Sequence, residues 1–197
     1  MTLHVIVATR IEPTPWRNGG GTARTLLTWP SADTLRVHVA LAHIGRDVAF
    51  SGYPGMQRWF MSLNAQPVLL KHRQHQVSLN VDSPPYEFDG GDPPFCELLQ
   101  GPIDDVSFMV PAAHGVAHAL RSEEGAEFAQ AGTWRGAFSV QAATLWVDGL
   151  QVAALPAHSL AWSADAHPGR WQLHSAGLPL QAWWLHYREH FGEQVGT

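Results

Sequence analysis

The sequence contains twelve histidines but a single lysine, Lys71, so the first chemistry to consider is metal binding. A metal site needs three or four ligands whose donor atoms converge on one point. His72 and His75 are three residues apart, which on a β-strand directs their side chains to opposite faces. The five-residue separation of His38 and His43 has the same effect. No His-x-His pair occurs, so we predict no metal site and no cofactor.

The common catalytic motifs do not occur in this sequence either. Lys71 follows no glycine-rich loop, so there is no P-loop, and no Gly-x-Ser-x-Gly elbow is present. Cys96 lies in an apolar run, where a buried and unreactive thiol is expected. Asp104 and Asp105 are adjacent, a spacing that suits a turn cap at least as well as acid–base chemistry.

The segment Trp16-Arg17-Asn18-Gly19-Gly20-Gly21 is the first candidate for ligand binding. Consecutive glycines allow positive φ and close backbone approach, so their N–H groups could form an anion-binding nest. Asn18 would add an amide with donors and an acceptor, and Trp16 a flat apolar wall. The alternative is a plain glycine turn beside a packed tryptophan.

Arg58 is the second candidate, because a Pro54-Gly55 turn places it at the start of a strand. On that strand Arg58 shares one face with Phe60 and Ser62. If this face lines a barrel interior, the guanidinium is a partly buried cation that requires an anionic partner. A carboxylate fits it with two parallel hydrogen bonds. The alternative is an arginine at the rim in solvent.

The elements that would position these residues are short β-strands, since most of the chain alternates between apolar and polar residues. Val37, Val39 and Leu41 share one strand face, and His38 shares the other with small residues. Only residues 121–131 could form a helical turn or two. Further strand-like runs end at turn signals and cover 3–8, 59–63, 67–73, 95–99, 138–147, 150–155 and 180–187. The sequence therefore predicts an all-β fold of two packed barrel halves, residues 1–110 and 111–197.

Composition excludes several classes of protein. The chain has 197 residues with 12 Lys and Arg against 17 Asp and Glu, a net charge of −5. Without a basic run, nucleic-acid binding is not expected. A single cysteine rules out an internal disulfide, and no apolar stretch is long enough to span a membrane. We expect a cytoplasmic protein that associates with neither membrane nor nucleic acid.

Together, these segments resemble the HutD/Ves family of bicupins, in the RmlC-like cupin superfamily. The resemblance lies in the Trp16–Gly21 segment with Arg24, in Phe50-Ser51-x-Tyr53-Pro54-Gly55 with Arg58, and in Gly101-Pro102 with Asp105 and Met109. It covers the first 110 residues, and the second half matches only by length. It implies a jelly-roll-like bicupin that lacks the metal-binding histidines, with a second half that is degenerate.

The resemblance also implies a non-catalytic regulator of histidine utilisation that binds a pathway metabolite such as urocanate or formylglutamate. The implied ligand-binding residues are Trp16, Asn18, Gly20, Arg24, His38, Ser51 and Arg58. Five polar positions of the family pattern have changed, giving Ala23, Thr25, His38, Ala40 and Ser107. Because His38 replaces an arginine, binding could become pH-dependent or shift from a dicarboxylate to a monocarboxylate.

Two alternatives stay open from the sequence. One is a cupin-type isomerase or oxygenase with His38 as its base, although the sequence shows no carboxylate to orient that histidine. The other is a structural or partner-binding protein with a vestigial pocket, whose tryptophan-rich second half forms an interface. A homodimer is compatible with each of these readings.

Overall fold

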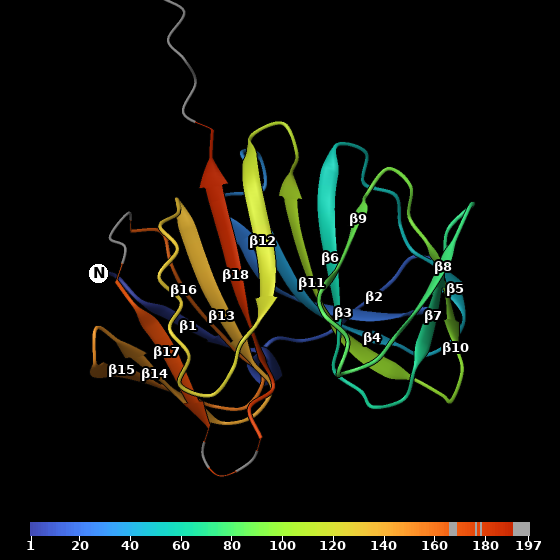
Figure 1. The fold of residues 1–197 in the computed structure, drawn as a ribbon. Coiled ribbons are helices and arrows are strands. Elements are labelled where there is room, and N and C mark those ends of the chain that lie inside the picture. The colour runs from blue at the N-terminus through green and yellow to red at the C-terminus, as the bar shows by residue number, and fades with distance from the viewer. Residues whose placement is uncertain (166–168, 176, 178, 191–197) are drawn as a thin grey trace, which may run out of the picture.

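The computed structural model describes all residues except 166–168, 176, 178 and 191–197. Alternating apolar residues form short antiparallel strands in two halves that lie side by side (Figure 1). Within the described residues the only helical element is a 3₁₀ turn, η1 (Ala8–Arg10). No described helix has the length and apolar character needed to cross a membrane.

The first half contains a large and a small sheet that face each other. The large sheet has the order β2 (Thr14–Pro15), β3 (Gly21–Trp29), β4 (Val37–Ile44), β11 (Ile103–Pro111), β6 (Met56–Ser62) and β9 (Tyr86–Asp89). The small sheet has the order β5 (Val48–Ala49), β10 (Phe95–Leu98), β7 (Val68–Lys71) and β8 (Gln76–Leu79). Aromatic and aliphatic side chains such as Phe60 and Leu70 fill the space between them.

The second half repeats this plan. Its large sheet has the order β1 (His4–Val7), β16 (Ser159–Ser163), β13 (Trp134–Ser139), β18 (Ala182–Glu189) and β12 (Gly115–Arg121). Its small sheet has the order β15 (Leu150–Leu155), β14 (Ala143–Val147) and β17 (Trp171–Ser175). Because β1 pairs with β16, this half contains residues from both ends of the chain. The division at residue 110 into two domains stays a prediction.

The two halves correspond strand by strand. The series β4-β11-β6-β9 of the first large sheet has the same chain order as β12-β18-β13-β16 of the second. The small sheets correspond in the same way, β10-β7-β8 with β17-β14-β15. The backs of the two large sheets enclose the main core, in which Trp59 and Phe108 meet Trp134 and Trp183. This duplicated arrangement is the all-β bicupin architecture predicted from the sequence.

Two local predictions were wrong. Residues 138–147 are not one strand, because β13 ends at Ser139 and β14 begins at Ala143, so the chain turns into the small sheet between them. Residues 121–131 contain no helical turn beyond the end of β12. Instead Phe128 forms an antiparallel bridge with Trp171 and packs into the second half, and this burial outweighs the weak helix preference.

Candidate functional site

Arg58 lies inside the first half, as its predicted strand face requires. Its side chain is only 8% exposed, and its Nη1 donates to the carbonyl of Ser51 at 2.9 Å. The guanidinium carbon lies 4.9 Å from the ring centre of Phe88, 5.2 Å from that of Tyr53 and 5.7 Å from that of Phe50. The arginine is therefore held in an aromatic cage that removes it from water.

One row of residues across the large sheet carries both Arg58 and His38. Register across β3, β4, β11, β6 and β9 aligns Thr28, His38, Met109, Arg58 and Phe88. Thr28 Oγ1 lies 3.2 Å from His38 Nδ1. Burial, and to a lesser extent the charge of Arg58, lowers the pKa of His38. His38 is thus a neutral hydrogen-bonding group at neutral pH rather than a second cation.

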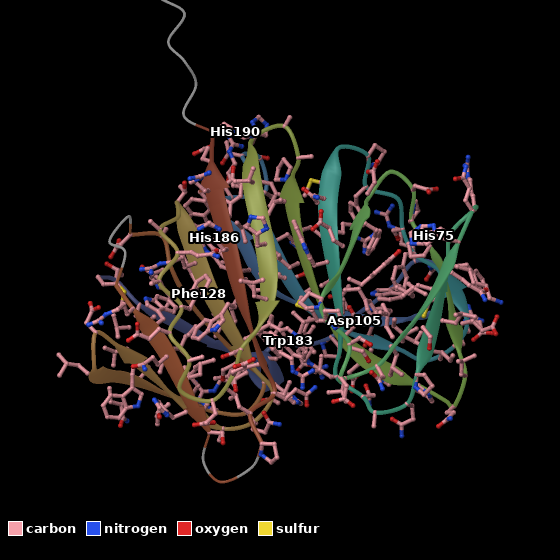
Figure 2. All side chains as sticks on the ribbon, in the orientation of Figure 1. His75, Asp105, Phe128, Trp183, His186 and His190 are labelled. Carbon is pink, nitrogen blue, oxygen red and sulfur yellow. The ribbon has the colours of Figure 1, made fainter. Side chains whose placement is uncertain are left out.

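Asp105 is the buried carboxyl group whose charge acts on Arg58. It is 3% exposed, and burial raises its pKa to about 8 although Arg58 opposes the shift. Burial also lowers the pKa of Arg58, but an arginine keeps its charge at any physiological pH. Burial thus disfavours the ionised form of Asp105, and its protonated carboxyl could donate a hydrogen bond beside the charged guanidinium. Figure 2 labels Asp105 within the first half.

The triple-glycine segment forms a closed loop rather than an open anion nest. Asn18 Nδ2 donates to the carbonyl of Ala49, and its Oδ1 accepts from the N–H of Gly20, both at 3.1 Å. The N–H of Gly19 donates to the carbonyl of Trp16 at 3.0 Å. These amide groups already form hydrogen bonds within the protein. The segment is therefore a glycine turn beside a packed tryptophan, the alternative to an anion-binding nest.

The glycines are needed because the loop packs tightly. A Cβ on Gly20 would lie 2.5 Å from the Val48 side chain, and one on Gly21 would lie 2.0 Å from the carbonyl oxygen of His43. Trp16 meets Phe50 edge to face with ring centres 6.3 Å apart. The segment therefore supports the wall of the cage around Arg58.

Arg24 is not brought together with the other candidates. It pairs with Leu41 on β4, whose side chain belongs to the core between the two halves, so Arg24 lies on the opposite face of the sheet from Arg58. Its Nε donates to the carbonyl of Ile11 at 3.0 Å. Ser51 contributes to the site through its backbone, while its side chain lies at the surface.

His72 and His75 come together, contrary to the expectation that a strand would separate them. They lie at the two ends of the turn that joins β7 to β8, so their side chains face each other and the rings stack with centres 4.6 Å apart. Both Nε2 atoms bond the hydroxyl of Tyr86, at 3.1 and 3.0 Å. The pair lines an open hollow of about 590 Å³, with Pro54, Gly55, Arg73, Gln74, Asp89, Gly91 and Asp92. Phe88 touches both His72 and Arg58, and so separates this rim hollow from the caged arginine.

No cluster of three or more His, Cys, Asp or Glu side chains suited to a metal ion occurs among the described residues. The stacked pair at the rim is joined by a phenol, and His38 bonds a threonine. The arrangement around Arg58 is instead suited to holding a small anion by charge and hydrogen bonds.

Comparison with known proteins agrees with this architecture. The family model described as HutD matches residues 8–178. The chain belongs to the HutD family. Among proteins of curated function, none matches the sequence of this HutD protein.

Solved structures similar to this HutD protein confirm the fold. PA5104 from Pseudomonas aeruginosa PAO1, a conserved protein of unknown function, superposes with a TM-score of 0.86 at 20% identity, covering 95% of this chain and 100% of that one. HutD from Pseudomonas fluorescens SBW25, solved in a formate condition, gives 0.82 at 19% identity, covering 95% and 99%. Oxalate decarboxylase from Bacillus subtilis gives 0.65 at 9% identity, covering 95% and 78%. The last match is cupin-like in fold only.

Sequence reasoning missed two parts of the site. Asp105 was considered as a turn cap and as part of the Gly101-Pro102 motif but was not predicted as a site residue, although the alternation of Ile103, Asp105, Ser107 and Met109 places it on the inner face of β11. Phe88 lies outside every strand-like run predicted from the sequence, whereas it lies on β9 directly beside Arg58. The alternating pattern of each short segment was the signal that could have found them.

Proposed function

We propose that this HutD protein binds a small carboxylate metabolite in its first half and acts as a non-catalytic modulator of histidine utilisation. The observation that carries the proposal is the buried guanidinium of Arg58, which lies among aromatic rings beside His38, whose pKa burial lowers, and Asp105, whose pKa burial raises. A buried cation without an ionised partner is costly, and a ligand carboxylate would remove that cost.

The groups around Arg58 favour a ligand that places one carboxylate, and not two, beside the guanidinium. His38 is uncharged at neutral pH, so Arg58 is the single cation of the row. A protonated Asp105 could donate to the bound carboxylate or to a carbonyl further along the ligand. The aromatic cage accommodates an apolar or planar body, which urocanate or a short acyl amino acid would provide.

Calorimetric titration with urocanate, formylglutamate and formiminoglutamate tests the proposal, with Arg58→Met as the decisive variant. Loss of a charge-assisted pair should weaken binding by roughly 10- to 150-fold. Arg24→Met is the matched control, because it removes an arginine from the opposite face of the same sheet and should leave the affinity unchanged.

Unchanged affinity in the Arg58→Met protein, or no binding of any of these compounds to the wild type, would refute carboxylate binding at Arg58. The same samples examined by NMR after prolonged incubation test the non-catalytic part. Conversion of a bound compound would show that the protein is an enzyme instead.

A further inference from the structure

The second half repeats the row that carries Arg58. Strand β13 occupies the position of β6, and it carries a buried arginine, Arg135. Register across β12, β18, β13 and β16 aligns His118, His186, Arg135 and Ser163. The corresponding residues on β4, β11, β6 and β9 are His38, Met109, Arg58 and Phe88. In both halves the first strand of this row carries a histidine and the third carries an arginine.

Both arginines are buried and contact a backbone carbonyl and an aromatic ring, although these partners come from different strands and loops in the two halves. Arg135 is 1% exposed, and its Nη1 donates to the carbonyl of Gly169 at 2.8 Å, as Arg58 Nη1 does to Ser51 at 2.9 Å. Its guanidinium carbon lies 5.0 Å from the ring centre of Trp171, against 4.9 Å between Arg58 and Phe88. A guanidinium has five N–H donors, so it can keep the bond to a carbonyl and also hold a carboxylate.

The walls of the two interiors correspond as well. In the first half β5 pairs with β10 and is followed by Phe50, which lies beside Arg58. In the second half Phe128 pairs with β17, the equivalent of β10, and meets the His186 ring edge to face at 6.2 Å. Phe128 and His186 are both labelled in Figure 2. An aromatic side chain thus covers the polar row in each half.

His186 supplies the observation that points to a ligand. Its side chain is 5% exposed, and its Nε2 lies 2.9 Å from the carbonyl of Ala131, so Nε2 carries the proton. Nδ1 is buried and has no hydrogen-bond partner among the described residues. Because burial lowers the pKa of His186, the neutral ring presents an unused acceptor to the interior, where such an atom is costly.

The row is open to solvent at one end. In the first half β3 covers β4, and Thr28 bonds His38. In the second half β12 is the edge of its sheet among the described residues, where no strand equivalent to β3 pairs with it. His118 is exposed, and its ring lies parallel to that of His186 with centres 6.3 Å apart.

We propose that the second half holds a binding site of its own for a small carboxylate that carries an adjacent hydrogen-bond donor, such as a 2-hydroxy acid. The carboxylate binds the guanidinium of Arg135, and the hydroxyl donates to His186 Nδ1. This site differs in chemistry from the first, where Met109 occupies the position equivalent to His186 and offers no such acceptor.

The test is an NMR titration of protein labelled with ¹⁵N-histidine, using glycolate and acetate as probes. The Arg58→Met variant is used so that the first site does not contribute. Glycolate should shift the signals of His186 and His118 saturably, and it should bind about three- to tenfold more tightly than acetate, which lacks the hydroxyl. Absence of a saturable shift at these two histidines, or equal affinity for both probes, would overturn the proposal.

Two further variants separate ligand recognition from folding. His186→Gln keeps a donor for the carbonyl of Ala131 but removes the Nδ1 acceptor. In this variant the affinities for glycolate and acetate, measured from the His118 signal, should therefore become equal. Persistence of the preference for glycolate would contradict the assigned role. Arg170→Met removes an exposed cation of the same half and should leave both affinities unchanged. Because the first site is monitored separately at His38 in the wild type, failure of one site does not imply failure of the other.

Discussion

Replacing Asp105 by asparagine should stabilise the protein in alkaline solution, and the size of the effect tests the electrostatics of the first half. The carboxyl is 3% exposed, and burial raises its pKa from 3.8 to about 8. Between these two pH values the folded state binds more protons than the unfolded state. The free energy of unfolding should therefore fall as pH rises through this window, and this contribution should be constant above it.

The expected magnitude follows from the width of the window. About 4 pH units at about 1.4 kcal/mol per unit give an upper limit of about 6 kcal/mol, of which about 4 kcal/mol falls between pH 5 and pH 8. This is a large part of the 5–15 kcal/mol that is typical of a folded domain. Asparagine has nearly the same shape and cannot ionise, so the variant should lack this contribution.

Urea denaturation from pH 5 to pH 9 measures the effect as the difference in unfolding free energy between variant and wild type at each pH. That difference removes the contributions of the other titrating groups. Asp104→Asn is the matched control, because the neighbouring carboxylate is 46% exposed and pairs with His43. If the difference for Asp105→Asn is the same at pH 5 and pH 9, then Asp105 is not buried in its protonated form. The inference that Arg58 lacks an ionised partner would then be refuted.

Three further predictions concern packing. Gly21→Ala should destabilise the protein by about 1–3 kcal/mol in urea, because its Cβ would lie 2.0 Å from the carbonyl oxygen of His43, whereas Gly52→Ala, with its nearest neighbour at 3.9 Å, should be tolerated. Cys96 is fully buried with a pKa raised to about 12, so a thiol reagent at pH 8 should modify it only in the unfolded protein. Tyr86→Phe should lower stability by about 1 kcal/mol in thermal unfolding, because the two stacked histidines lose their shared hydroxyl. The first prediction is contradicted if the two alanine variants are equally stable, and the second if the thiol of the native protein reacts rapidly. The third is contradicted if Tyr86→Phe leaves the melting temperature unchanged.

The sequence was sufficient where strands alternate regularly. The pattern around His38 predicted its face correctly, since Val37 and Val39 lie in the core between the halves and His38 lies on the opposite face. Arg24 was a candidate through the family resemblance and not through the alternation; in the structure a bulge between Thr25 and Leu27 shifts the register of β3, and Arg24 lies on the face opposite Arg58.

Residues brought together by a turn or by a sheet cannot be paired from strand spacing. His72 and His75 meet because the chain reverses between them, whereas the prediction treated them as one strand. Arg58 and Asp105 lie on neighbouring strands that are distant in the sequence, and their interaction depends on the register of β6 with β11. Both the cage and the protonation of Asp105 are therefore properties of the folded protein.

In the second half, the order in which strands pair reveals a relationship between Arg58 and Arg135 that the sequence pattern does not show. Arg58-x-Phe60-x-Ser62 and Arg135-x-Ala137-x-Ser139 share only an arginine and a serine, which no motif search would relate. Their strands are nevertheless equivalent, and both arginines are buried. An apolar side chain of similar volume would stabilise such a position at least as well as a buried charge. The two buried guanidinium groups lie on equivalent strands, so each half is a candidate for anion binding that the two titrations test separately.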